Sequence, residues 1–231
     1  MTVPFEDAKD QLLDAILMHV AFDGWSQASF RAAINDTGMD PGLADSVCPR
    51  GAVDLAMAYH ARGDALMLER LKTDDMSDLR YRDKIARAVR LRIEAVDDKE
   101  AVRRGTTLFA LPLYAPDGAK AIWGTCDLIW DALGDTSDDA NWYTKRATLS
   151  GVYTSTILYW LGDDSPGSEA TWDFLDRRID NVMQIEKVKS AVRGSALLKP
   201  LLIGPEWLMS KIKAPTKPAD MDLPGMINPR R

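Results

Sequence analysis

Apolar residues recur every three or four positions through most of this 231-residue chain, and this spacing limits it to a helical fold. In the first expected helix, Leu13, Ile16 and Val20 share one stripe and Asp14 lies off it. No stretch alternates cleanly enough between apolar and polar residues to indicate a strand. We therefore predict an all-α fold with helices over residues 7–21, 26–35, 40–48, 51–72, 77–95, 98–111, 118–133, 138–161 and 168–188, the fourth of them loosened at Gly63-Asp64.

The order of these helices indicates how the chain is organised. Three short helices joined by tight turns come first and longer helices follow, an arrangement that resembles the TetR-like helical bundle. We expect a helix-turn-helix-like unit at residues 1–50, a helical bundle at 51–188, an amphipathic membrane-contact segment at 189–214 and a disordered tail at 215–231. With 46% apolar residues, the body has ample material for a buried core.

The distribution of charge argues against binding to nucleic acid. The net charge is −6, and the segment from Asp23 to Arg50, which spans the helix-turn-helix pattern, has two arginines against four aspartates. Acidic side chains that face phosphates repel them. We therefore expect no nucleic-acid partner, although the same helical plan leaves a TetR-type ligand-sensing transcriptional regulator as the alternative function.

The chain carries few of the side chains that catalysis or metal binding needs. Its two histidines are His19 and His60, and neither follows a glutamate at the three-residue spacing of a di-iron bundle. The two cysteines, Cys48 and Cys126, lack the spacing of a zinc site or a disulfide framework. We expect no catalytic residue, no metal site, no cofactor and hence no enzyme. For His19, at the edge of an apolar stripe, we predict a hydrogen-bonded position beside the core.

The C-terminal segment has the composition of a membrane-surface contact. From Lys187 onward nine basic residues face three acids, so this part carries +6 and the rest of the chain −12. Residues 196–213 are apolar, contain Trp207 and are bracketed by lysines, which favours an interfacial segment over a membrane span or packing on the body. The residues expected to contact membrane lipid are Leu201, Leu202, Trp207, Leu208, Lys211, Ile212 and Lys213.

Large aromatic and charged side chains crowd together in residues 127–146. A hydrophobic core does not need that mixture, whereas a binding surface uses aromatic anchors ringed by charges. The alternative is a capped helix start, with carboxylates at its positive end and aromatic rings that bury themselves. On the first interpretation, the partner-binding residues are Asp127, Asp131, Asp135, Asp138, Trp142, Tyr143, Lys145 and Arg146.

Several strings in this part of the chain resemble one known family. They are Asp-Leu-Ile-Trp (127–130), Gly-Asp-Thr-Ser-Asp (134–138), Asn-Trp-Tyr-Thr-Lys-Arg (141–146), Gly-Val-Tyr-Thr-Ser-Thr (151–156) and Thr-Trp-Asp-Phe-Leu-Asp-Arg-Arg-Ile (171–179). They resemble the ubiquinone-biosynthesis accessory family, non-catalytic lipid-binding proteins that support the demethoxyubiquinone hydroxylase. The resemblance covers most of residues 10–185 and departs at Ala140, where a larger aromatic is expected.

This resemblance implies a ligand and partners. It implies an isoprenoid quinone or other lipid bound in the bundle, which a homodimer in contact with membrane lipid presents to the demethoxyubiquinone hydroxylase. The residues expected to contact the bound lipid are Leu108, Phe109, Leu111, Ile122, Trp123, Leu149, Val152, Tyr153 and Ile157.

The location of the protein is expected from the same resemblance and from the first residues of the chain. The start, MTVPFEDAKD, lacks the charge pattern of a signal or transit peptide, and no window is long and apolar enough to span a bilayer. We expect a cytoplasmic protein, peripheral on the bacterial inner membrane.

Overall fold

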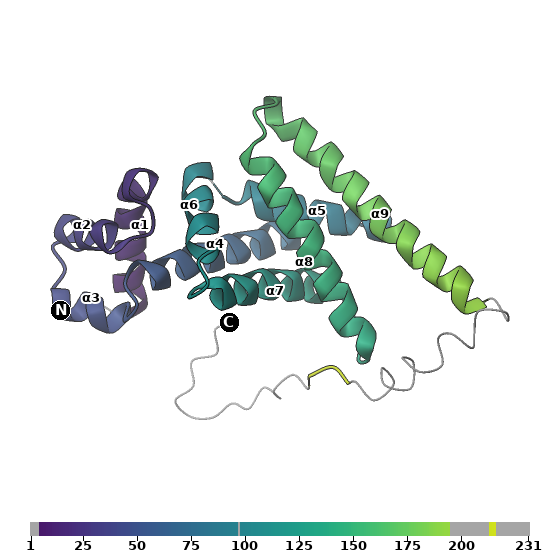
Figure 1. The fold of residues 1–231 in the computed structure, drawn as a ribbon, viewed down its shortest axis with the longest axis horizontal. Coiled ribbons are helices and arrows are strands. Elements are labelled where there is room, and N and C mark those ends of the chain that lie inside the picture. The colour runs from purple at the N-terminus through teal and green to yellow at the C-terminus, as the bar shows by residue number, and fades with distance from the viewer. Residues whose placement is uncertain (1–4, 97, 195–212, 216–231) are drawn as a thin grey trace.

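The computed structural model describes residues 5–96, 98–194 and 213–215, and within these ranges it contains helices and no strand (Figure 1). The all-α prediction is therefore confirmed. No helix in this part of the chain has both the length and the apolar character that crossing a bilayer requires. The elements are α1 (Phe5–Asp23), α2 (Gln27–Thr37), α3 (Pro41–Val47), α4 (Ala52–Thr73), α5 (Tyr81–Glu94), α6 (Lys99–Phe109), α7 (Ala115–Ala132), α8 (Ala140–Leu161), the short 3₁₀ turn η1 (Pro166–Ser168) and α9 (Glu169–Gly194).

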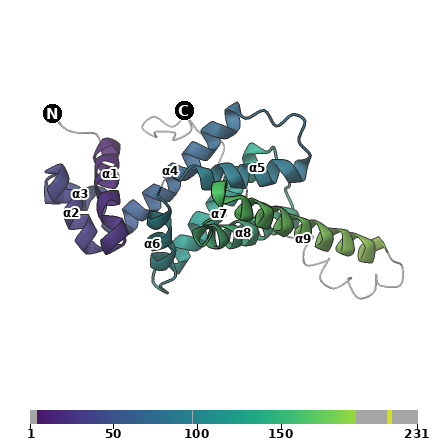
Figure 2. The same ribbon diagram turned by 90° about the horizontal axis from the view of Figure 1, so that it is seen from above.

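Helices α1, α2 and α3 form a small unit at one end of the molecule (Figures 1 and 2). Ser26 and Ser29 start α2 with a reciprocal capping box, in which the backbone N–H of each donates to the side-chain oxygen of the other, at 3.0 and 3.2 Å. The helix ends at Gly38, which adopts the left-handed conformation with φ 62°. His19 lies 2.6 Å from the Asp36 carboxylate, which confirms the predicted hydrogen-bonded position.

Helix α4 runs from this unit into the larger bundle, so that one helix contributes to two cores (Figure 2). Its first half packs Leu55 among the buried residues of α1 to α3, and its second half packs Met67 against α5, α7 and α8. Two further bonds join the N-terminal unit to α6. The Trp25 indole donates to the Ala101 carbonyl at 3.0 Å, and Arg104 donates to the Ala21 carbonyl at 2.8 Å.

The predicted loosening of α4 at Gly63-Asp64 is wrong, because the helix is continuous there. The two residues instead accommodate a buried side chain from α5. Arg92 is 3% exposed, its Nε donates to Asp64 at 2.6 Å, and its Nη2 donates to the His60 carbonyl at 2.9 Å. A Cβ on residue 63 would lie 2.5 Å from the Arg92 Nη1 atom. Glycine is therefore used here for close packing rather than for flexibility.

The predicted helix boundaries lie within a few residues of the observed ones. The largest differences are the start of α5, predicted at residue 77, and the end of α9, predicted at residue 188. At the first, the Asp75 carboxylate accepts from the Ser77 backbone N–H at 3.0 Å and holds a turn before the helix. The division of the chain into four parts stays a prediction, and residues 195–212 and 216–231, which include most of the last two parts, lie outside the described residues.

We predict that Gly63→Ala lowers the free energy of unfolding by about 1–3 kcal/mol, because the new methyl group meets a guanidinium that Asp64 and a backbone carbonyl hold in place. The matched control is Gly151→Ala in α8, where nothing lies within 4 Å of the new Cβ and a gain of about 0.5–1 kcal/mol is expected. Urea unfolding measures both values. Equal shifts of the same sign in the two variants would contradict the packing role of Gly63.

Candidate functional site

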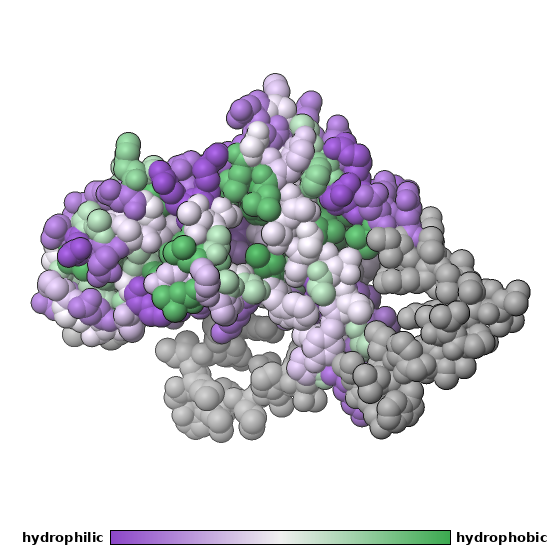
Figure 3. Space-filling view, viewed as in Figure 1, coloured by the Kyte–Doolittle hydropathy of each residue, from purple (hydrophilic) through white to green (hydrophobic). Residues whose placement is uncertain are grey.

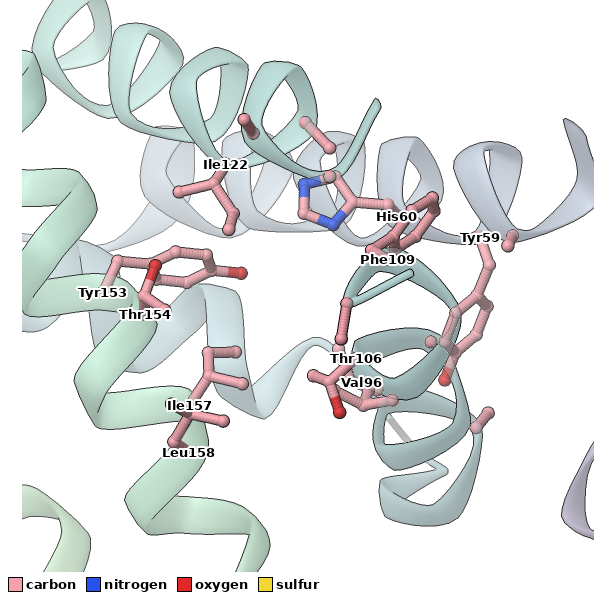
Figure 4. Close-up of a pocket in the computed structure, with 18 of the residues that line it drawn as sticks. Tyr59, His60, Val96, Thr106, Phe109, Ile122, Tyr153, Thr154, Ile157 and Leu158 are labelled. Atoms are coloured by element: carbon pink, nitrogen blue, oxygen red, sulfur yellow. The ribbon is translucent and has the colours of Figure 1, made fainter. Parts of the chain in front are cut away.

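A cavity of about 400 Å³ lies between α4, α5, α6, α7 and α8. Its wall is mainly apolar and includes Phe109 of α6, Ile122 of α7 and Ile157 of α8 (Figure 4). Leu158 also lines the cavity and is 58% exposed, so it marks the mouth. In Figure 3, apolar side chains gather on both sides of a hollow between α6 and α8. The size and lining are those of a site for an apolar organic ligand.

Polar side chains from α4, α5 and α7 form one hydrogen-bonded group, of which His60 and Arg92 line the inner wall of this cavity. Thr125 donates to Asp64 at 2.8 Å, and His60 Nε2 lies 2.8 Å from the Thr125 hydroxyl. The single Thr125 hydrogen points to two acceptors, the Asp64 carboxylate and the Ala121 carbonyl at 3.2 Å. In the bond between Thr125 and His60, the proton is therefore assigned to His60 Nε2. Arg92 completes the group through its bond to Asp64, so that these buried polar groups satisfy one another.

The polar group is close to neutral as a whole. The Arg92 cation pairs with the Asp64 anion. Burial, helped by the Arg92 charge, lowers the pKa of His60 to about 4, so this histidine is uncharged at physiological pH. The inner wall therefore offers polarity without a net charge.

Tyr153 enters the cavity from the opposite side, on α8. Its side chain is 2% exposed, and its hydroxyl points into the cavity toward His60 (Figure 4). Burial raises the pKa of Tyr153 to about 12, so the hydroxyl keeps its proton and remains a donor. No residue in the described part of the chain forms a hydrogen bond with it.

Four of the nine residues predicted to contact lipid, namely Phe109, Ile122, Tyr153 and Ile157, line this cavity. The other five lie elsewhere, because helical spacing does not tell which neighbour a residue faces. Leu149 and Val152 line a second, smaller pocket of about 250 Å³, Leu108 packs against the N-terminal core, Leu111 is 50% exposed and Trp123 contacts the rings of Trp142 and Tyr143. Lipid contact stays a prediction for the four, and the cavity gives no support to it for the five.

Sequence reasoning missed the α4 and α5 side of the cavity, including Tyr59, His60 and Arg92. An arginine within a helix that is rich in charge gives no sign that it is buried. The sequence contains one sign of this buried arginine, the Gly63-Asp64 pair one turn after His60. Gly63 leaves space for a large side chain, and Asp64 provides a negative charge that can pair with a cation.

The second candidate site is the acidic and aromatic corner formed by the end of α7, the following turn and the start of α8. At its centre, Arg146 is 1% exposed and pairs with three carboxylates, those of Asp127, Asp131 and Asp135, two of them at 3.4 and 3.1 Å. Lys145 pairs with Asp135 at 2.7 Å. These contacts fix the turn between α7 and α8.

Three aromatic rings pack together beside this cluster of charges, and one of them lies over Arg146. The Arg146 guanidinium lies 4.0 Å from the centre of the Trp142 ring. Trp142 contacts Tyr143 edge-on at 4.7 Å between ring centres and Trp123 at 5.9 Å. Tyr143 is 37% exposed, and Trp142 is half-buried. The corner thus presents a preformed aromatic surface.

The structure corrects two members of the predicted partner surface. The side chains of Asp135 and Arg146 are 2% and 1% exposed. They therefore stabilise the corner and are not accessible to a partner protein. Asp138, Trp142, Tyr143 and Lys145 retain accessible surface, as do Asp127 and Asp131, and for these six the partner role stays a prediction.

Residues 213–215 lie beside this corner. Tyr143 donates from its hydroxyl to the Lys213 carbonyl at 3.4 Å, and the Ala214 N–H donates to the Asp138 carbonyl at 2.8 Å. Lys213 is exposed. It belongs to the predicted membrane-contact set, whose other members (Leu201, Leu202, Trp207, Leu208, Lys211 and Ile212) lie outside the described residues.

A sequence profile of the COQ9 family matches residues 115–186, which include the corner and much of the cavity wall. The mitochondrial ubiquinone biosynthesis protein COQ9 of Drosophila melanogaster is 32% identical to this chain over 208 residues, which are 84% of the chain and 63% of that protein. For COQ9 of Rattus norvegicus the identity is 28% over 209 residues, with 85% and 66% covered, and for COQ9 of Homo sapiens it is 25% over 210 residues, with 85% and 65% covered.

The fold also resembles a solved structure. A TetR transcriptional regulator from Nitrosomonas europaea superposes with a TM-score of 0.60 and 18% identity, over 75% of this chain and 96% of the regulator. This likeness confirms the predicted TetR-like fold and carries no information on function. The chain spans 63% to 66% of the lengths of the three COQ9 proteins.

We predict that acid weakens the fold through Asp135. Its burial acts to raise its pKa, but hydrogen bonds from Lys145, Ser137 and Arg146 outweigh burial and hold the pKa at about 2, below the ordinary 3.8. Its contribution is therefore complete above about pH 4 and is lost as the pH falls toward about 2, at a cost of about 1–2 kcal/mol.

Asp135→Asn is expected to flatten the fall of unfolding free energy between about pH 5 and pH 2, as denaturant titrations at several pH values will show. Asp138→Asn, which changes an exposed carboxylate three residues away, is the control and should keep the slope of the unchanged chain. An identical slope for Asp135→Asn and the unchanged chain would refute this role.

Proposed function

The chain resembles the COQ9 ubiquinone-biosynthesis proteins over 84% of its length, and from this premise we propose that it acts in ubiquinone biosynthesis as a non-catalytic, lipid-binding accessory protein. It takes up a quinone intermediate with an isoprenoid tail and presents the head group to the demethoxyubiquinone hydroxylase at the membrane. The ligand is an isoprenoid quinone or a related lipid, and no cofactor is required.

The observation that carries this proposal is the cavity. Its apolar wall suits an isoprenoid chain, and its inner wall is polar and without net charge. A quinone has the same division, with an apolar tail and an uncharged ring that bears oxygen atoms. The cavity volume of about 400 Å³ falls in the range of sites for drug-sized ligands. A long isoprenoid tail must therefore extend through the mouth beside Leu158.

The state of the histidines supports a role for the partner, and not for this chain, in the chemical step. His60 is bonded to Thr125, and its lowered pKa leaves it a poor base at physiological pH. His19 is paired with Asp36 in the N-terminal unit, away from the cavity. We assign the hydroxylation to the hydroxylase and assign binding and positioning to this chain.

The acidic and aromatic corner is the proposed contact with the hydroxylase. Trp142 and Tyr143 form an aromatic surface that the Arg146 cluster fixes in place, and a preorganised surface loses less entropy on binding. The charged residues Asp138 and Lys145 at the edge of this surface fix the orientation of the partner on it. Aromatic anchors of this kind provide much of the affinity of protein interfaces.

Membrane attachment is proposed from composition, because most of the relevant residues lie outside the described part. The basic, apolar segment that ends at Lys213 provides lipid contact, and the protein is a homodimer peripheral on the bacterial inner membrane. Lys213, at the end of this segment, is exposed and lies beside Tyr143 of the proposed hydroxylase contact.

The alternative of a TetR-type regulator receives support from the fold alone. Within α3, the Asp40 side chain caps the helix by accepting from the Leu43 N–H at 3.0 Å, and Asp45 is exposed. This helix contains no basic residue that could meet a phosphate. A DNA-binding role is therefore disfavoured.

We predict that Trp142→Ala combined with Tyr143→Ala removes association with the hydroxylase, a weakening of at least about tenfold, because the aromatic surface is lost. Co-purification and titration of the two proteins measure the effect, and circular dichroism verifies that the fold remains. Tyr159→Ala is the control, since Tyr159 is 39% exposed near the other end of α8, close to the 37% of Tyr143. Wild-type association of the double variant would remove the corner from consideration.

We predict that a source strain without this gene accumulates demethoxyubiquinone and makes little ubiquinone, as mass spectrometry of extracted lipids will show. Wild-type protein should restore the quinone profile, and so should Ala61→Trp, which alters an exposed position of α4 away from the cavity. Ala119→Trp places the same ring at the exposed edge of the cavity and should fail to restore it. An unchanged profile in the deletion strain under respiring conditions would overturn the proposed function.

A further inference from the structure

We propose that the Tyr153 hydroxyl is the hydrogen-bond donor that anchors an oxygen atom of a neutral lipid deep in the cavity. This inference rests on the proposed lipid-binding function and extends it, because it assigns one atom of the protein to one chemical feature of the ligand. The feature is an uncharged acceptor oxygen, such as the carbonyl oxygen of a quinone.

The geometry at Tyr153 indicates a site for an acceptor. The side chain is 2% exposed, and its hydroxyl points into the cavity (Figure 4). Among the described residues none forms a hydrogen bond with this hydroxyl. A donor that faces the cavity without a partner in the described chain would become buried and unpaired once an apolar ligand fills the cavity, which is costly, so the site favours a ligand that accepts a hydrogen bond there.

The other cavity tyrosine differs in this respect. Tyr59 of α4 also lines the cavity (Figure 4), but its hydroxyl already donates to the Asp98 carbonyl at 3.4 Å. The two tyrosines therefore share an environment and differ in whether the hydroxyl has a partner within the chain.

The charges near Tyr153 favour a neutral ligand. Arg92 lines the cavity, but its Nε donates to Asp64 and its Nη2 donates to the His60 carbonyl, and the Asp64 anion balances its charge. A ligand carboxylate would add a negative charge to this closed pair without a free cation in the described wall to meet it. A carbonyl or ether oxygen adds no charge and needs only a donor, which Tyr153 provides.

The shape of the cavity then sets the direction of the ligand. The oxygen-bearing end lies between Tyr153 and His60, and the tail follows the apolar side chain of Ile157 toward the mouth at Leu158 (Figure 4). In this direction the apolar tail leaves through the exposed apolar edge, and the polar end meets the polar wall. The reverse direction would leave both ends mismatched.

The test uses the full chain and two probes of similar shape, decyl-substituted para-benzoquinone and decylbenzene, with affinities measured by calorimetry. We expect Tyr153→Phe to weaken quinone binding by about three- to tenfold, the contribution of one neutral hydrogen bond, and to leave decylbenzene binding unchanged. Tyr59→Phe should leave the ratio of the two affinities unchanged. Infrared spectra should show the carbonyl band of the bound quinone at a lower frequency in the unchanged chain than in Tyr153→Phe.

The outcomes separate this inference from the proposed function. If Tyr153→Phe leaves the affinity ratio and the carbonyl band unchanged, the anchoring role is overturned while lipid binding stands. If it weakens both probes equally, the hydroxyl maintains the cavity as a whole and does not bond to the ligand oxygen, and the anchoring role is again overturned. If the unchanged chain binds neither probe, the lipid-binding function fails and this inference fails with it.

Discussion

The ion pair between Arg92 of α5 and Asp64 of α4 is the contact on which the centre of the bundle depends. It places a guanidinium in the interior, where the lost hydration is costly unless every polar atom around it is bonded. Asp64 also accepts from Thr125 of α7, and Arg92 reaches the backbone of α4 at His60. One pair therefore fixes the relative positions of three helices and builds the polar wall of the cavity. Gly63 provides the space that this arrangement needs.

Helix α8 joins the two candidate sites. Its first turns carry Trp142, Tyr143 and Arg146, and its later turns carry Tyr153 and Ile157 of the cavity wall. The absence of charged side chains between Arg146 and the end of α8 lets its middle pack in the bundle, while its charged beginning pairs with α7. A displacement of α8 would therefore move the corner and one wall of the cavity together.

The fold was largely predictable from the sequence, and the sites were predictable in part. Apolar periodicity predicted every α-helix of the described part, because each helix buries one stripe and the stripe is visible in the order of residues. The corner was also visible, since Asp127, Trp142 and Arg146 are near one another in the chain. Periodicity does not reveal which charged residue is buried, and for that reason Arg146 was assigned to the surface and Arg92 was not singled out. Both are buried through partners on other helices, and such pairings become apparent only when the helices are placed in space.

The separation of Tyr153 from the corner has a kinetic consequence. Tyr153 follows Tyr143 by ten positions in α8, a rise of about 15 Å along one helix. A head group held beside Tyr153 is thus out of reach of an enzyme bound at the corner, and the ligand must leave the cavity before it can react. A single neutral hydrogen bond suits this requirement better than an ion pair, because residence time follows the strength of the contacts that must break. On the proposed function, the cavity therefore releases its ligand and does not store it.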